Sequence, residues 1–334
     1  MNGPRAGGEM ELALYLSDLD ALLHLEQGLR NSDSFDIPQF IFASMFGDDP
    51  GAQEYLGNLV ASEWLENYLA AGHKVSRLYF GQEFCEHLIP SCDDLEKALS
   101  VARESGLHFT YVTGYVTDDG LAVTRRNLAW LAEHSPDSEV VVNDWGVLAM
   151  LAEEFPTLQP VLGRLQIKQQ RMARFTTKAP QVSMRGVNAP EADVLGRQIA
   201  ALRRLNLSIP EYRQRLQGLG VKRFDLDIVP QGVEIPAGAW GFGVSCYYPW
   251  GYVTGSRNCY TAGMLDPRRS YVVTGARCPA PCRRMNRGAK IKHFPQPPVQ
   301  RGNSVFIYHT QYATPYWNGD IPIDRIVFEP WIPL

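Results

Sequence analysis

Four cysteines carry the clearest chemical signal in this sequence. Cys259, Cys278 and Cys282 form a C-x18-C-x3-C group, and Cys85 follows an apolar run that begins at Leu78. Thiolates gathered from distant parts of a chain bind soft metals, and an all-cysteine set suits zinc or an iron–sulfur cluster. We therefore take these four residues as the candidate metal and cofactor ligands.

The spacing of the cysteines favours a cluster over zinc. Zinc ribbons usually carry two close cysteine pairs, and this chain has one, Cys278 and Cys282. Pro279 and Pro281 restrict the loop between them, which reduces the entropy lost when the loop is ordered. A [4Fe–4S] cluster needs four thiolates for full ligation, and Cys85 would supply the fourth from the end of a separate strand. A [4Fe–4S] cluster is the predicted cofactor, with a zinc ribbon as the alternative.

Two further cysteines compete for a place in the ligand set. Cys246 lies in an apolar-aromatic run beside Tyr247, thirteen residues before Cys259. A free cysteine in such a run is usually a small buried hydrophobic residue. Cys92 follows Cys85 closely enough to substitute for it. The sequence leaves open whether either of them replaces a ligand.

Polar residues at predicted strand ends are the candidate catalytic groups. Asn143 and Asp144 follow one strand and Arg164 follows another. At the carboxyl-terminal rim of a barrel such residues are placed for chemistry, and an arginine fork can hold a carboxylate. The alternatives are that Asp144 caps the next helix and that Arg164 forms a surface salt bridge. Glu83 and Arg257, each two residues from a proposed ligand, would tune the cluster or, as the sequence favours, be ordinary surface charges.

The elements that must position these residues alternate between strands and helices. Amphipathic stretches such as 93–105 and 124–134 lie between short β-like runs, and Asp93 is the expected N-cap of the first. The expected strands cover Leu12–Leu16, Val75–Gly81, His108–Val112, Glu139–Asn143, Gln159–Gly163, Arg223–Val229, Gly241–Cys246, Val305–Tyr308 and Arg325–Phe328. Repeated strand–helix units favour a parallel sheet. At 334 residues the fold class is α/β, a (β/α)8 TIM-barrel-like fold with an extended C-terminal segment.

The chain divides into three parts along its length. Residues 1–10 are polar and Gly-rich, lack the apolar core of a signal peptide and are expected to be disordered. Residues 11–282 form the barrel domain with the iron–sulfur site. Residues 283–334 begin with a basic, Pro-rich linker and end in strands that pack on the barrel or close it. We expect the last strand, Arg325–Phe328, to close it.

These motifs resemble a known family, the collagenase-like U32 peptidases, and within it the oxygen-independent hydroxylase branch that includes anaerobic ubiquinone-biosynthesis hydroxylases. The segments that carry the resemblance are Leu78–Cys85, His108–Asp118, Val140–Gly146, Val161–Arg164 and Asn258–Cys282. The resemblance implies that Cys85, Cys259, Cys278 and Cys282 hold a [4Fe–4S] cluster. The loop between Cys259 and Cys278 is longer than the family pattern.

The resemblance also implies an activity. It implies hydroxylation of an aromatic or related small molecule without oxygen, with prephenate as a candidate oxygen donor. An RNA-modifying hydroxylase of the same family and a non-catalytic Fe–S subunit of a heteromeric complex are the alternatives. The partner would be a homologous protein or, in a homo-oligomer, a second copy of the chain. The sequence shows no nucleophile–base arrangement and no HExxH motif, so a classical peptidase is not expected.

Charge is distributed unevenly. Residues 1–160 carry 8 basic and 26 acidic side chains, net −18, and residues 161–334 carry 24 and 10, net +14. The basic segment Arg268–Lys292 would contact RNA phosphates or a partner, although a solvated loop is the commoner outcome and RNA the less favoured partner. No apolar run approaches the ~20 residues of a membrane helix. We expect a cytoplasmic protein, where thiols stay reduced and bind metals.

Overall fold

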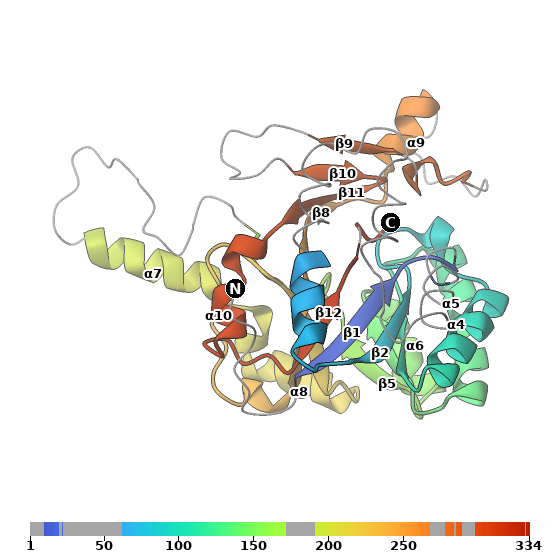
Figure 1. Ribbon diagram of the computed structural model, residues 1–334, viewed down its shortest axis with the longest axis horizontal. Helices are drawn as coiled ribbons and strands as arrows, with labels where there is room; N and C mark the ends of the chain where they lie inside the picture. Colours follow the sequence, from blue (N-terminus) through green and yellow to red (C-terminus); the bar gives the residue numbers. More distant parts are fainter. Residues whose placement is uncertain are drawn as a thin grey trace.

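The computed structural model describes residues 10–19, 22, 62–171, 191–267, 278–283, 285–288, 298–330 and 332–334. Eight parallel strands close a barrel in the order β1-β12-β7-β6-β5-β4-β3-β2, and a four-stranded sheet in the order β8-β11-β10-β9 lies at one end of it (Figure 1). Helices surround the barrel (Figure 1). The predicted TIM-barrel-like α/β fold is therefore confirmed.

The elements match most of the predicted ranges. The barrel strands are β1 Glu11–Leu16, β2 Val75–Gly81, β3 His108–Val112, β4 Glu139–Val142, β5 Gln159–Leu162, β6 Arg223–Asp227, β7 Gly243–Tyr248 and β12 Arg325–Phe328. The helices are α4 Cys92–Glu104, α5 Asp118–His134, α6 Trp145–Glu154, α7 Glu191–Arg203, α8 Pro210–Gly218, α9 Tyr260–Leu265 and α10 Thr314–Trp317. Ser91, not Asp93, caps α4, because its hydroxyl accepts from Asp94 N while the Asp94 carboxylate accepts from Ser91 N.

The barrel closes through β12, as predicted. Arg325–Phe328 pairs with β1 on one side and with β7 on the other, parallel to both. The predicted strand Val305–Tyr308 instead falls in the second sheet. That sheet contains β8 Trp250–Gly255, β9 Asn286–Gly288, β10 Val299–Arg301 and β11 Ser304–Tyr308, and its adjacent strands are antiparallel. The sequence did not predict this sheet.

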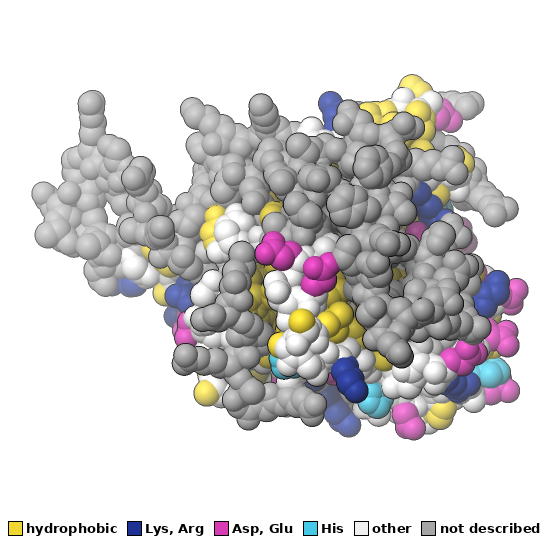
Figure 2. Space-filling view, in the orientation of Figure 1, with side chains coloured by type: hydrophobic (Ala, Val, Ile, Leu, Met, Phe, Trp, Pro, Cys, Tyr) yellow, Lys and Arg dark blue, Asp and Glu magenta, His cyan; other side chains and the backbone are white. Residues whose placement is uncertain are grey.

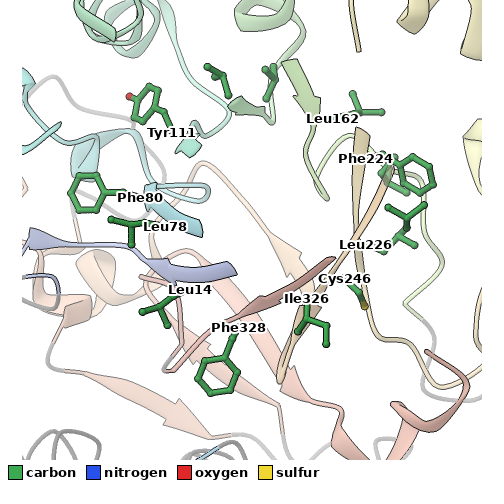
Figure 3. Close-up of a cluster of buried hydrophobic side chains, with 14 of the residues drawn as sticks. Leu14, Leu78, Phe80, Tyr111, Leu162, Phe224, Leu226, Cys246, Ile326 and Phe328 are labelled. Atoms are coloured by element: carbon green, nitrogen blue, oxygen red, sulfur yellow. The ribbon is translucent and has the colours of Figure 1, made fainter. Parts of the chain in front are cut away.

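Successive side chains along each barrel strand point to opposite faces, which produces two buried layers. One face of each strand packs against the helices through side chains such as Leu14, Phe80, Leu226 and Phe328 (Figure 3). The opposite face fills the barrel interior with Ala13, Tyr15, Tyr79, Val112, Val141, Val161, Tyr247 and Val327. This inner layer is small, so charged side chains occupy the interior above and below it.

A partly buried ion network lies at the amino-terminal end of the barrel. Arg325 from β12 donates to Glu11, Glu139 and the Tyr79 hydroxyl, and Arg77 also pairs with Glu11. Burial opposes ionisation of Glu11 and Glu139, but the two arginines hold the pKa of both carboxyls below the ordinary value. The network joins four strands through charge pairs.

Candidate functional site

All four predicted cysteine ligands line one pocket beside the carboxyl-terminal end of β2. Cys85 immediately precedes the short 3-10 helix η1 Glu86–Leu88, Cys259 precedes α9, and Cys282 lies in η5 Pro281–Arg283. Cys282 is buried, and Cys85, Cys259 and Cys278 are half-buried. The pocket lies between the barrel and the second sheet, because Cys85 follows the barrel strand β2 and the other three cysteines lie between β8 and β9 in the sequence. The residues that line it are Phe84–Leu88, Tyr115, Arg257, Cys259, Ala262, Cys278, Ala280, Cys282, Gly302, Asn303 and Leu334.

The end of β2 is fixed by the residues that precede Cys85. Gly81 has φ +138°, and a Cβ there would lie 2.1 Å from the Val112 carbonyl oxygen, so only glycine fits. Glu83 points into the barrel and accepts from Arg164. The Phe84 ring packs edge-on against Phe306 with centroids 5.0 Å apart. Cys85 therefore follows a conformationally restricted glycine and two anchored side chains, Glu83 and Phe84, which limits its freedom.

A hairpin turn in the second sheet connects the cysteine segments. Gly302 and Asn303 form the two-residue turn between β10 and β11. Asn303 Nδ2 donates to the Phe84 carbonyl at 2.6 Å and to the Ser256 carbonyl at 2.8 Å, so it links the segment of Cys85 to that of Cys259. A Cβ on Gly302 would lie 3.3 Å from Cys282 Cβ. The sequence analysis missed Asn303, although a Gly-Asn pair between two β-like runs is a hairpin signal.

Cys259 is also the N-cap of α9. Its sulfur accepts from Ala262 N at 3.4 Å, and Thr261 donates its hydroxyl to the Gly302 carbonyl. Backbone N–H groups aimed at a sulfur stabilise a thiolate. The helix start thus orients the Cys259 sulfur while the hairpin turn holds the helix.

Burial keeps three of the thiols protonated when no metal competes. Burial raises the pKa of Cys85 to about 12 and that of Cys282 to about 11, and it also raises the pKa of Cys259. The other thiols of the group add to the rise at Cys85 and Cys282. Metal binding would displace these protons, because the thiolate is the ligand.

The donor set, four thiols, is of the kind that binds zinc or an iron–sulfur cluster. Within the described ranges, no group of three or more His, Cys, Asp or Glu side chains is arranged to hold a metal ion. A structural zinc site needs four sulfurs about 2.3 Å from one ion. In a cubane cluster each thiolate binds a different iron, so the sulfurs stand farther apart. The four thiols that line one pocket are the donors that both arrangements use.

The two competing cysteines lie outside this pocket. Cys246 is fully buried on β7 in the layer that faces the helices (Figure 3). Cys92 is the first residue of α4, and its thiol donates to Asn127 Oδ1 at 3.3 Å. Neither lines the pocket with Cys85.

Asn143 and Asp144 have structural roles at the end of β4. Asn143 is buried, donates to the Thr113 carbonyl at 2.8 Å and to Glu83 Oε1 at 3.3 Å, and accepts from Leu165 N. Asp144 caps α6 by accepting from Gly146 N at 2.7 Å. The helix-cap alternative therefore describes Asp144. Neither residue lines the cysteine pocket.

Arg164 lies in a buried cluster of carboxylates inside the barrel. Its guanidinium donates to Glu83 at 2.6 Å, to Glu329 at 2.6 Å and to Asp227 at 3.1 Å, and every one of these side chains is fully buried. The Tyr247 ring lies 3.8 Å from the guanidinium carbon. The surface salt-bridge alternative for Arg164 is thereby corrected, because its ion pairs are buried, and its guanidinium is bonded to carboxylates of the protein.

Charge in this cluster is close to balanced. Burial alone would lower the pKa of Arg164, but Glu329, Glu83 and Asp227 raise it well above its ordinary value. Burial raises the pKa of Glu83 and of Glu329, although Arg164 opposes the rise. Arg171 adds a second cation by donating to Asp227 at 2.8 Å. The expectation that Glu83 is a surface charge was wrong, because its partners lie far away in sequence.

The mouth of the pocket carries its own polar groups. Arg257 is exposed, donates to the Val116 carbonyl at 3.1 Å and lies 5.9 Å from the Tyr115 ring centroid. Glu86 accepts from Thr117 N at 2.7 Å and from its hydroxyl at 2.8 Å. His87 is exposed beside them. The prediction that Arg257 is exposed is confirmed, and the same residue lines the cysteine pocket.

Parts of other predicted segments fall outside the described residues. These are 1–9, the stretches 268–277 and 289–292 of the basic segment, and 289–297 of the Pro-rich linker. Nothing in the structure bears on RNA contact by those stretches. In the part of the chain that is described, no helix is long and apolar enough to cross a membrane.

Comparison with known proteins gives a distant likeness to a solved structure. No family model matches the chain, and no curated protein matches it. A solved structure entitled "The Structure of the U32 Peptidase Mk0906" is similar over 98% of this chain and 96% of that one, with 10% sequence identity and a TM-score of 0.36. At this score and identity the likeness supports no conclusion about activity.

Proposed function

We propose that this protein is an iron–sulfur enzyme that hydroxylates an aromatic or related small molecule without molecular oxygen. The observation that carries the proposal is that Cys85, Cys259, Cys278 and Cys282 line one pocket. The reaction class rests on the resemblance of the cysteine and strand-end motifs to the hydroxylase branch. When bound, a [4Fe–4S] cluster would supply one-electron redox chemistry at the pocket.

The residues at the pocket mouth would bind the oxygen donor. Prephenate, the donor that the resemblance implies, carries two carboxylates. Arg164 is already bonded to three carboxylates of the protein. We therefore transfer its expected role, holding a carboxylate of the donor, to Arg257, which lines the pocket. Its guanidinium would hold a donor carboxylate in a charge-assisted fork, with Tyr115 beside it.

Metal analysis of anaerobically purified protein tests the first part of this proposal. We expect about four irons and four sulfides per chain if ligation follows the four-thiolate pattern. Stoichiometric zinc without sulfide would refute it. Titration with prephenate tests the second part, because Arg257→Gln should weaken binding while the iron content stays at the wild-type value.

A second candidate function is a non-catalytic Fe–S subunit of a heteromeric complex. The observation that favours it is that Asn143, Asp144 and Arg164 hold structural positions and none lines the pocket. The two candidates differ in turnover by the isolated chain. Cluster-loaded protein that consumes prephenate under reducing, anaerobic conditions would be the enzyme. Loaded protein that consumes none would be the subunit.

A further inference from the structure

An exposed apolar surface lies directly beside the cysteine pocket. Four large apolar side chains form it: Tyr260, Met264 and Leu265 on α9, which are 57, 49 and 59% exposed, and Met285, 39% exposed. They are joined in space because Arg287, two residues after Met285, contacts the Met264 sulfur at 3.8 Å. We call these four residues the α9 patch. Figure 2 shows apolar side chains gathered at the upper right, where Figure 1 places α9.

The patch and the pocket are opposite faces of the same short helix. On its inner face α9 buries Thr261, Ala262 and Gly263, and Ala262 lines the cysteine pocket. Cys259 is the N-cap of the helix. A helix with its side chains is about 10–12 Å across, so a molecule seated on the patch would come within about one helix diameter of the pocket wall that Ala262 forms.

The exposed charged residues described beside the patch are basic, and Asp266, which follows Leu265, is half-buried. Arg283 and Arg287 are both exposed, and they flank Met285 in the sequence. An apolar centre with a basic rim is complementary to an apolar centre with an acidic rim. Methionines at such a surface adapt to differently shaped partners.

The composition of the patch argues against a second copy of the chain. A two-fold dimer places the same surface against itself, which would bring Arg283 and Arg287 of one copy towards those of the other. Stable interfaces also use about 20–30 residues on each side, whereas transient redox encounters are smaller. Four apolar side chains and two arginines fit the smaller class.

We propose that the α9 patch docks a small acidic protein that carries one electron, and that this partner reduces the group held by the four cysteines. The proposal rests on the proposed iron–sulfur function. In the transfer the carrier is oxidised by one electron and the cysteine-bound group is reduced by one, with no bond made or broken. Electron delivery through α9 leaves the pocket mouth at Tyr115 and Arg257 free for the small molecule.

Calorimetric titration tests docking without needing the cluster. The probes are an oxidised flavodoxin and an oxidised plant-type [2Fe–2S] ferredoxin, both acidic one-electron carriers. We expect one of them to bind, and the binding to weaken between about 0.01 and 0.1 M salt, as the Debye length shortens from about 30 to 10 Å. Leu265→Glu and Arg287→Glu should each raise the Kd at least tenfold. Ile209→Glu and Arg126→Glu, exposed positions away from the patch, should leave it unchanged.

A rapid-mixing measurement with the loaded protein completes the test. Reduction by the same carrier in its reduced state should slow in the two patch variants, while reduction by dithionite should proceed at the wild-type rate. The absence of salt-sensitive binding by both carriers would overturn the proposal. So would a wild-type dimer that Leu265→Glu converts to a monomer, because the patch would then bind a second copy. Failure of the iron–sulfur proposal would appear separately, as missing iron and sulfide.

Discussion

Arg164 donates two hydrogen bonds to one oxygen of Glu83, at 3.0 and 2.6 Å, and so ties the strand end that carries Cys85 to the barrel interior. The same guanidinium reaches Glu329, which lies just beyond β12. A buried arginine shared among carboxylates fixes its neighbours in one geometry, because breaking any pair would leave an uncompensated charge. The ion cluster in the barrel interior thus holds in place the strand end that leads to Cys85 and the pocket.

Arg164→Lys should destabilise the protein by about 3–5 kcal/mol, the cost of breaking a buried pair. An ammonium cannot reproduce the planar fork that serves three carboxylates at once. Urea unfolding measures the change. Arg125→Lys is the matched control, because its pair with Glu154 is exposed and its loss should cost under about 1 kcal/mol. Wild-type stability combined with lost turnover would instead restore the role of Arg164 as a substrate clamp.

Variants of the cysteines should fall into two groups that differ in the iron content of the purified protein. Cys85→Ser and Cys282→Ser each remove one thiolate of the pocket, so iron per chain should fall in both. Cys246→Ala and Cys92→Ala should keep the iron of the wild type, since neither residue lines the pocket. Iron and sulfide analysis of anaerobic preparations gives the result. Loss of iron in a folded Cys246→Ala variant would show that the ligand set is wrong.

Asn303→Ala should loosen the pocket without touching a ligand. The change removes the donors to the Phe84 and Ser256 carbonyls and leaves buried acceptors unpaired, at about 1–3 kcal/mol. We expect lower stability and faster loss of iron to a chelator. Asn206→Ala, in η2 Asn206–Ser208 near α8, is the control for the loss of a side-chain amide. This variant should lose iron to the chelator at the wild-type rate.

The barrel strands could be predicted from the sequence because alternation and apolar runs are local signals. Val75–Gly81 and His108–Val112 were predicted with their observed bounds. The cysteine group also gave a local signal, through residue type and spacing. The buried surroundings of Glu83 did not: its partner Arg164 lies 81 residues away, and Glu329, which binds the same arginine, lies a further 165 residues along. A charged residue next to a strand gives the same sequence signal whether its side chain is hydrated or paired with a buried arginine. Only the closed barrel shows which of the two environments Glu83 has.

The second sheet was missed for a related reason. Its strands β9 and β10 have three residues each, too few for a period to register. Its pairing joins β8 to β11 across about fifty residues. The position of Asn303 depends on that pairing, because the residue lies in the turn between β10 and β11. It was therefore missed together with the sheet.

Acid should destabilise the protein in part through His309. Its ring is buried, with Gly251 and Tyr312 against it, and Nδ1 has no hydrogen-bond partner. Burial lowers the pKa of His309 to about 4, although Asp227 opposes the shift. The unfolded chain takes up the proton at its ordinary pKa, near 6.5. The contribution of His309 to the free energy of unfolding is therefore fully present above pH 6.5. It is lost as the pH falls from about 6.5 to 4, and the total loss is roughly 3 kcal/mol.

His309→Gln removes the titrating ring, so the difference in unfolding free energy between variant and wild type should shift in favour of the variant as the pH falls through that window. Urea unfolding at a series of pH values measures it. His108→Gln, at an exposed position on β3, should run parallel to the wild type throughout. A His309→Gln profile that also runs parallel to the wild type would mean that the native His309 accepts its proton as readily as the unfolded chain, and that the ring is not sealed from water at the junction of the barrel and the second sheet.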